Sequence, residues 1–203
     1  MPPQDLKYRG EPSRLVIGAD TVIREHATLH LGTEGGHMET RVGDRCLLMV
    51  GVHIAHDCIV GNNVILANNA TLAGHVTVGD HVILGGLSAV HQWARIGDHA
   101  FVGGMSGVAH DLIPFGMLVG NRGRLGGLNL VGLRRAGYPR EQIHALRAAY
   151  RALFSGAGSL ATRTDDLEAR FGGSPLVDRL VTFLRAGGDR EISTPESIEA
   201  DGE

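Results

Sequence analysis

Histidine is the residue type in this sequence with the most capacity for chemistry, because the 203 residues include 11 histidines. Five of them recur at nearly the same place in an 18-residue period: His53, His56, His75, His91 and His110. Asp57 follows His56 directly, Gly74 lies one period later, and Gln92 lies two periods later. A histidine beside a carboxylate, with a glycine N–H close by, suits general-base catalysis with a donor for an oxyanion. Metal binding is the competing interpretation, since histidine is the commonest metal ligand.

The other histidines carry weaker signals. His81 and His99 both lie in Gly-Asp-His turns, and we expect both to be exposed corner residues without a chemical role. Four more lie outside the regular part of the repeat, and their spacing assigns them no chemistry: His26, His30, His37 and His144.

A strict six-residue repeat positions these histidines. An aliphatic residue returns at every sixth position from Val42 to Val108, and the fourth residue after each is small or aliphatic. This period fits neither a helix nor an alternating strand, and it indicates a solenoid of stacked units. Three units make a triangular coil, so residues 18 apart stack at about 4.8 Å. The pattern resembles the hexapeptide-repeat superfamily, which implies a left-handed parallel β-helix, an exception to the usual crossover rule.

The repeat and its end predict a mainly β protein with a small C-terminal α-helical domain. We expect the β-helix over residues 1–120, with a polar loop over 33–41 where the repeat slips by one residue. Helical spacing then predicts helices from Pro139, over 160–171 and over 174–185, within a helical domain at 121–190. The acidic, polar residues 191–203 are expected to form a disordered tail.

Composition narrows the class of protein. The net charge of −3 predicts no nucleic-acid partner, and no stretch is apolar enough to cross a membrane. The N-terminus has no signal-peptide core, and Cys46 and Cys58 both fall on inward positions of different faces. We therefore expect a cytoplasmic protein with two reduced core cysteines. The first residues form no obvious cap for the open end of a solenoid, so we also expect a partner, the helices or further residues to cover it.

Several strings along the histidine edge carry a family resemblance. They are QDLKY (4–8), GEP (10–12), HIAHDC (53–58), LANNATLAGHV (66–76), AVHQ (89–92) and GLRRAGY (132–138). Together they resemble the acyl-ACP–UDP-N-acetylglucosamine O-acyltransferase family over essentially the whole chain. The resemblance implies transfer of a 3-hydroxyacyl chain from acyl carrier protein to the 3-hydroxyl of UDP-N-acetylglucosamine, the first step of lipid A biosynthesis. It also implies a homotrimer with active sites between neighbouring prisms.

The resemblance implies a role for each matching residue. His56 matches the general base, Asp57 the residue that supports it, and the Gly74 N–H the oxyanion donor. Gly104 matches the position that limits acyl-chain length, although a plain turn glycine is the alternative. The implied substrate-binding residues are Asp5, Lys7, His53, His75, His91, Gln92, Asn129 and Arg135. No metal, cofactor or covalent acyl-enzyme is implied, because the donor arrives on the phosphopantetheine of acyl carrier protein.

The sequence departs from the family pattern in three places. Val131 and Ala136 stand where the family often has an acidic and a basic residue, which weakens the expected nucleotide contacts. The chain also starts shortly before QDLKY, where members of the family carry further coils. Two alternatives therefore stay open: a trimeric zinc carbonic anhydrase with the same repeat, and a shortened, non-catalytic subunit.

Overall fold

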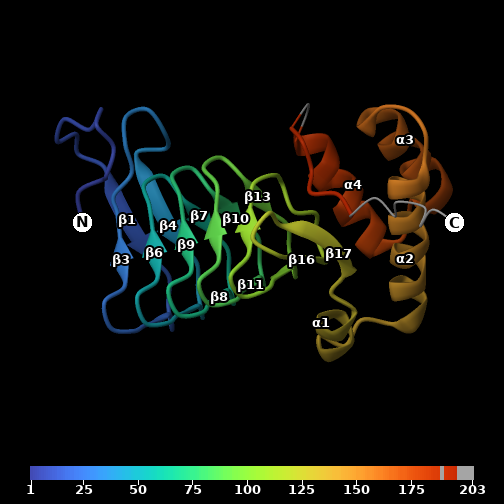
Figure 1. The fold of residues 1–203 in the computed structure, drawn as a ribbon, viewed down its shortest axis with the longest axis horizontal. Helices are drawn as coiled ribbons and strands as arrows, with labels where there is room; N and C mark the ends of the chain where they lie inside the picture. The colour runs from blue at the N-terminus through green and yellow to red at the C-terminus, as the bar shows by residue number, and fades with distance from the viewer. Residues whose placement is uncertain (188–189, 196–203) are drawn as a thin grey trace, which may run out of the picture.

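The computed structural model describes residues 1–187 and 190–195, and it shows a three-sided parallel β-helix followed by a group of helices (Figure 1). Strands on each side pair with the strand one coil further on, as Ile59 does with Thr77 and Thr77 with Arg95. These partners are 18 residues apart, so the triangular coil predicted from the repeat is confirmed.

Each side of the β-helix is one sheet. Sheet A contains β1 (Arg14–Ile17), β4 (Glu39–Val42), β7 (Ile59–Val60), β10 (Thr77–Val78) and β13 (Arg95–Ile96). Sheet B contains β2 (Val22–Ile23), β5 (Leu47–Leu48), β8 (Ile65–Leu66), β11 (Ile83–Leu84), β14 (Phe101–Val102), β16 (Gly116–Val119) and β17 (Arg124–Leu128). Sheet C contains β3 (Thr28–Leu29), β6 (His53–Ile54), β9 (Thr71–Leu72), β12 (Ala89–Val90) and β15 (Gly107–Val108).

The core fills the inside of the prism with the repeat residues. Leu48, Ile54, Leu66 and Leu72 are completely buried, and so is the small or aliphatic residue that follows each of them four places later. Cys58 is one of these small residues, and both cysteines are buried and unpaired, as predicted. Because each hexad has two inward-facing positions, it forms a short strand followed by a tight corner. Most corners place a non-glycine residue at positive φ, Asp57 and His75 among them.

One coil is longer than the others. Ile17 pairs with Val42, 25 residues on, so this coil carries seven more residues than the 18-residue repeat. The extra residues form a loop before β4, as the slipped repeat predicts. The loop is shorter than the expected range 33–41, because Glu39, Thr40 and Arg41 already pair with β1.

The β-helix continues past the end of the sequence repeat. Pro114 breaks the hexad, but Met117 still pairs with Phe101 across β16 and β14. β17 then runs antiparallel to β16, and it lies in the range expected for the helical domain. The prediction from the repeat missed this hairpin because main-chain pairing does not need an aliphatic residue every six places.

Four helices follow: α1 (Leu130–Arg135), α2 (Arg140–Ser155), α3 (Leu160–Phe171) and α4 (Pro175–Gly187). The last three match the predicted helices, although Pro139 caps α2 rather than starting it. The six-residue α1 was not predicted; it starts where the Asn129 side chain accepts a hydrogen bond from the Gly132 N–H. Among the described residues, no helix has the length and apolar character that crossing a membrane requires.

The segment after α4 is part of the fold. Residues 191–195 fall in the expected disordered tail, but the Asp111 N–H donates to the Glu191 carbonyl oxygen, the Ser193 N–H donates to the Asp111 carbonyl oxygen, and Ser193 is buried. The Asp111 carboxylate, also buried, accepts hydrogen bonds from Arg95 and Arg190. Residues 196–203 lie outside the described residues.

Candidate active site

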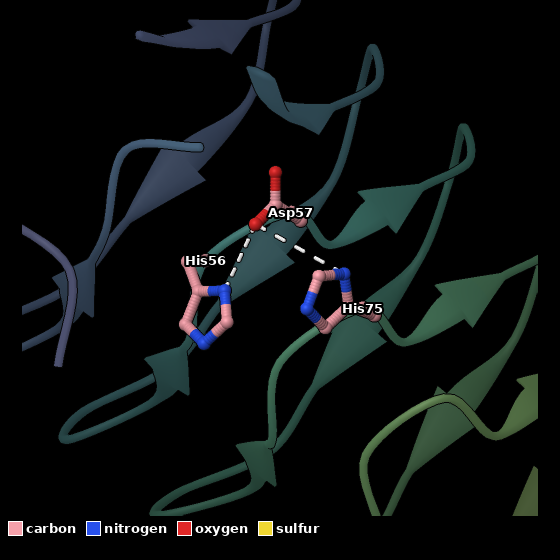
Figure 2. Close-up of side chains that lie close together, drawn as sticks. All are labelled: His56, Asp57 and His75. Atoms are coloured by element: carbon pink, nitrogen blue, oxygen red, sulfur yellow. Dashed lines mark hydrogen bonds and ion pairs between the residues drawn. The ribbon is translucent and has the colours of Figure 1, made fainter. Parts of the chain in front are cut away.

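The site is centred on the turn that joins β6 to β7, at the edge between sheets C and A. This turn consists of His56 and Asp57, and His56 Nδ1 lies 2.9 Å from Asp57 Oδ2 (Figure 2). A carboxylate can only accept, so we assign the Nδ1 proton to this hydrogen bond. The lone pair of the neutral ring is then on Nε2, and His56 is oriented as a general base.

The carboxylate of Asp57 is buried and held by donors. It accepts hydrogen bonds from the Thr33 N–H at 3.0 Å, the Thr33 Oγ1 at 2.6 Å and the His37 N–H at 2.8 Å. Burial by itself raises the pKa of Asp57, but these donors and His56 outweigh it and hold the pKa below its ordinary value. Asp57 is therefore ionised at neutral pH and supports the proton on His56 Nδ1.

His75 comes from the corner of the next coil and faces the same carboxylate. Its Nδ1 lies 4.0 Å from Asp57 Oδ2, and this buried atom has no hydrogen-bond partner among the described residues. The ring is stacked on Trp93, with 3.7 Å between ring centroids and parallel planes. Burial lowers the pKa of His75, so this imidazole is neutral near pH 7.

Gly74 lies directly against the His56 ring. A Cβ at this position would come within 2.6 Å of His56 Cε1 and Nε2, which real Cβ atoms do not do. The Gly74 N–H makes no hydrogen bond to another described residue. A free N–H beside the basic nitrogen is the arrangement that an oxyanion donor requires.

His53 and its neighbours extend the site along sheet C. His53 faces outward from β6, its Nδ1 lies 2.8 Å from Thr28 Oγ1, and its ring meets His30 edge to face. Burial lowers the pKa of both histidines. His30, to which the sequence assigned no chemistry, is therefore a buried neighbour of the predicted site.

The remaining residues predicted near this edge are less enclosed. His91 and Gln92 are exposed, one coil beyond His75. Asp5 lies near enough for its charge to act, as a minor effect, on His75. Lys7 is exposed, and its backbone N–H donates to Asp5 Oδ1. His110 also follows the repeat, but it faces Glu191 at the end of the prism and takes no part in the His56 cluster.

The structure does not bring Asn129 and Arg135 to His56 within one chain. Both line a hollow of about 860 Å³ over sheet B and its edge with sheet A. His99 lines the same hollow, and the prediction that it is an exposed corner residue is wrong. It is buried, stacked on His81, and its Nε2 lies 3.0 Å from the Tyr138 hydroxyl. His81 is exposed, as predicted. The six-residue repeat correctly places His99 at a corner of the prism. It does not show that α1 and the residues after it cover His99.

Gly104 lies on the third edge of the prism, between sheets B and C. It is exposed, and a Cβ there would meet the Gly86 carbonyl oxygen at 3.3 Å and the Gly86 nitrogen at 4.0 Å. Leu87 and Met105 on this edge are also exposed. The edge is therefore apolar and open where Gly104 lies.

The metal interpretation has one candidate group. Among the described residues, His56, Asp57 and His75 have ligand atoms within 4.8 Å of one another. However, the oxygens of Asp57 already accept hydrogen bonds from Thr33, His37 and His56. A carboxylate satisfied in this way suits a histidine–carboxylate pair better than a metal ligand.

Sequence reasoning missed the residues that hold this pair. Thr33, Gly36 and Thr40 surround Asp57 from the long coil, and Trp93 stacks on His75. The only signal in the sequence was the slipped repeat before Val42, which marks an insertion but not the direction in which it folds.

Two family profiles match the chain. A profile described as "Udp N-acetylglucosamine O-acyltransferase; Domain 2" matches residues 111–193, and a six-repeat bacterial transferase hexapeptide profile matches residues 39–74. An acyl-[acyl-carrier-protein]–UDP-N-acetylglucosamine O-acyltransferase of Methylobacterium radiotolerans is 55% identical over 97% of this chain and 72% of its own length. A protein of the same name from Paracoccus denitrificans is 51% identical over 95% of this chain and 73% of its own length.

Solved structures agree with the sequence relatives. LpxA from Acinetobacter baumannii superposes with a TM-score of 0.90 and 39% identity, over 96% of this chain and 75% of that one. UDP-N-acetylglucosamine acyltransferase from Arabidopsis superposes with a TM-score of 0.88 and 37% identity, over 96% of this chain and 70% of that one. The parallel β-helix described above is thus the left-handed β-helix of these proteins.

Proposed function

Because the chain belongs to the acyl-ACP–UDP-N-acetylglucosamine O-acyltransferase family, we propose that it acylates UDP-N-acetylglucosamine in lipid A biosynthesis. The observation that carries the proposal is the buried Asp57 carboxylate, which orients His56 Nδ1 and leaves Nε2 as the base. A zinc carbonic anhydrase is not favoured, either by the relatives or by the hydrogen bonds around Asp57.

The proposed reaction is a direct transfer. His56 Nε2 removes the proton from the 3-hydroxyl of the sugar as its oxygen attacks the thioester carbonyl carbon of the 3-hydroxyacyl donor. The carbonyl oxygen becomes an oxyanion, and the Gly74 N–H donates to it. When the intermediate collapses, the carbon–sulfur bond breaks, and the phosphopantetheine thiolate takes the proton from His56. His56 removes the proton from the sugar hydroxyl and later gives it to the thiolate, so the proposed mechanism needs no metal and no acyl-enzyme.

The other matching residues are proposed to hold the two substrates. His53, His75, His91 and Gln92 line the edge next to His56, and Asp5 and Lys7 lie on the N-terminal loop that serves the sugar nucleotide. Asn129 and Arg135 serve the nucleotide and its phosphates from another face of the prism. Because one chain holds them apart from His56, the complete site requires a second copy.

A homotrimer through the prism faces would supply that copy. The outward positions of sheet B form an apolar row, and none of its six members is fully buried in the single chain: Val22, Leu47, Ile65, Ile83, Phe101 and Met117. An ordered row of large apolar side chains marks a protein–protein interface. Sedimentation of the purified protein is expected to give a trimer, and a fully active monomer would contradict this assembly.

Acyl carrier protein is the proposed donor partner. The exposed face of α2 carries three arginines and one histidine at helical spacing: Arg140, His144, Arg147 and Arg151. No ion pair joins these residues to an acid within the part of the chain that the structure describes. An unpaired basic face suits a negatively charged carrier domain. With soluble substrates and reduced cysteines, the proposed location is the cytoplasm.

The test of the function is an acyl-transfer assay with purified protein, UDP-N-acetylglucosamine and 3-hydroxyacyl-ACP. We expect acylated sugar nucleotide from the wild-type chain, and turnover lowered about 10²–10⁴-fold by His56→Ala. His110→Ala, at an exposed position that takes no part in the His56 cluster, is the histidine control and is expected to leave kcat unchanged. Near-normal turnover by His56→Ala would contradict the assignment of the base.

A further inference from the structure

We propose that Thr33 and Gly36, in the loop 33–38 of the long coil, are positioning residues that hold Asp57 so that His56 works as a base. This inference rests on the proposed function of His56 and assigns to this loop a role in the same site. The loop is the insertion that lengthens one coil from 18 to 25 residues. It folds back onto the next corner of the prism, where Asp57 is located.

Hydrogen bonds from the loop hold the Asp57 carboxylate in place. Both the N–H and the hydroxyl of Thr33 donate to Asp57, one to each oxygen. The His37 N–H donates to Oδ1 at 2.8 Å. Thr33 is 2% exposed and Asp57 1% exposed, so water does not replace these donors. The loop thereby fixes the rotation of the carboxylate and aims Oδ2 at His56 Nδ1.

The loop can approach so closely because residue 36 has no side chain. A Cβ on Gly36 would lie 2.2 Å from Asp57 Cγ and within 2.5 Å of both carboxylate oxygens. Gly35, the preceding residue, has open space around its missing Cβ. The two glycines therefore form a matched pair, of which only Gly36 is required by contact with Asp57.

The hydrogen bonds from the loop also affect the ionisation of Asp57. Burial would favour the neutral acid, and the Thr33 donors are the chief opposing influence that keeps the pKa of Asp57 low. Loss of a donor makes the carboxylate harder to ionise, so the acid limb of the kcat/KM profile should move to higher pH. A loop that served only the fold would leave that limb in place.

The experiment compares five variants of the full chain in the acyl-transfer assay. Thr33→Val removes the hydroxyl and keeps the shape, and Thr33→Ser restores a hydroxyl. Gly36→Ala introduces the clash, and Gly35→Ala is its control. Thr77→Val, at an exposed outward position on β10, controls for the loss of a threonine hydroxyl elsewhere. Circular dichroism and sedimentation establish that each variant is folded and assembled at the assay temperature.

We expect Thr33→Val to lower kcat about tenfold to hundredfold, the effect of losing a hydrogen bond to a charged group, with little change in KM for the sugar nucleotide. Thr33→Ser should recover most of this loss. Gly36→Ala should lower kcat at least as far, whereas Gly35→Ala and Thr77→Val should stay within about twofold of wild type. The acid limb should move upward only in Thr33→Val and Gly36→Ala.

The proposal is overturned if Thr33→Val keeps kcat within about twofold, or if its loss follows only the loss of folded protein. An NMR measurement made without substrates tests the positioning role independently of the proposed acyltransferase function. The proton between His56 Nδ1 and Asp57 should give a far-downfield NMR signal that His56→Ala abolishes. Its loss or shift in Thr33→Val supports the positioning role even if UDP-N-acetylglucosamine is not the acceptor. An unchanged signal contradicts it.

Discussion

Gly74 lies so close to the His56 imidazole that a Cβ added to it would stand 2.6 Å from both Cε1 and Nε2. The two residues belong to consecutive coils, and the His75 N–H donates to the His56 carbonyl oxygen at 3.0 Å. Coil stacking therefore sets how closely the Gly74 backbone approaches the His56 ring.

Gly74→Ala should displace the His56 ring, because the backbone of a stacked coil cannot yield. We expect turnover to fall about 10²–10³-fold, comparable to the loss of an oxyanion donor, while the protein remains folded. Gly35→Ala is the matched control, since a Cβ at Gly35 would meet no atom within 4 Å. The check is kcat alongside thermal unfolding; equal activity of the two variants would contradict the geometry.

Gly104→Met should shift the preference of the enzyme toward shorter acyl donors. Gly104 is exposed, and a Cβ there would lie 3.3 Å from the Gly86 carbonyl oxygen, so the new side chain requires only a small shift of this corner. The side chain then blocks the apolar edge near Leu87 and Met105. Each excluded methylene forfeits about 0.8 kcal/mol, so two of them cost about tenfold. Turnover with a short and a long acyl-ACP, measured side by side, decides the point. An unchanged ratio would mean that Gly104 is only a turn residue.

Stability should fall as the pH drops below about 6.5, the ordinary pKa of histidine. Burial lowers the pKa of His53, His75 and His99 in the folded chain. Between the unfolded and the lower folded pKa, the unfolded chain binds more protons, so acid favours unfolding in this window. Urea unfolding at pH 7.5, 6.5 and 5.5 measures the trend. His99→Gln should flatten it and exposed His144→Gln should not; a flat profile in the wild type would contradict the burial argument.

Asp111→Asn should loosen the contact between the prism and the C-terminal segment. Asp111 is completely buried and accepts hydrogen bonds from Arg95 Nε at 2.7 Å and Arg190 Nε at 3.1 Å. We expect a cost of about 1.5–3 kcal/mol, the loss of a hydrogen bond to a charged group, because the Arg95 and Arg190 side chains, 19% and 41% exposed, still reach water. Asp166→Asn, which breaks the exposed pair with Arg170, should cost less than about 1 kcal/mol. Denaturant midpoints of the two variants give the comparison.

The sequence by itself determined the prism and the edge that carries the site. The aliphatic residue at every sixth position must face inward, and this fixes the corner that holds His56 and the coil that holds Gly74. The string HIAHDC at this corner resembles the acyltransferase family, and this resemblance, rather than the repeat, assigned His56 its role. Helices α2, α3 and α4 also followed from local spacing and glycine stops.

Only the tertiary structure decided what surrounds these residues. The loop 33–38 has no repeat, so nothing in its sequence shows that Thr33 and His37 turn their donors toward Asp57. Likewise, the repeat places His99 at a corner, but its burial depends on Tyr138, 39 residues away. The hexad repeat fixes which way a side chain points from its own coil. The partners it meets come from segments outside the repeat, and their positions depend on how the whole chain packs.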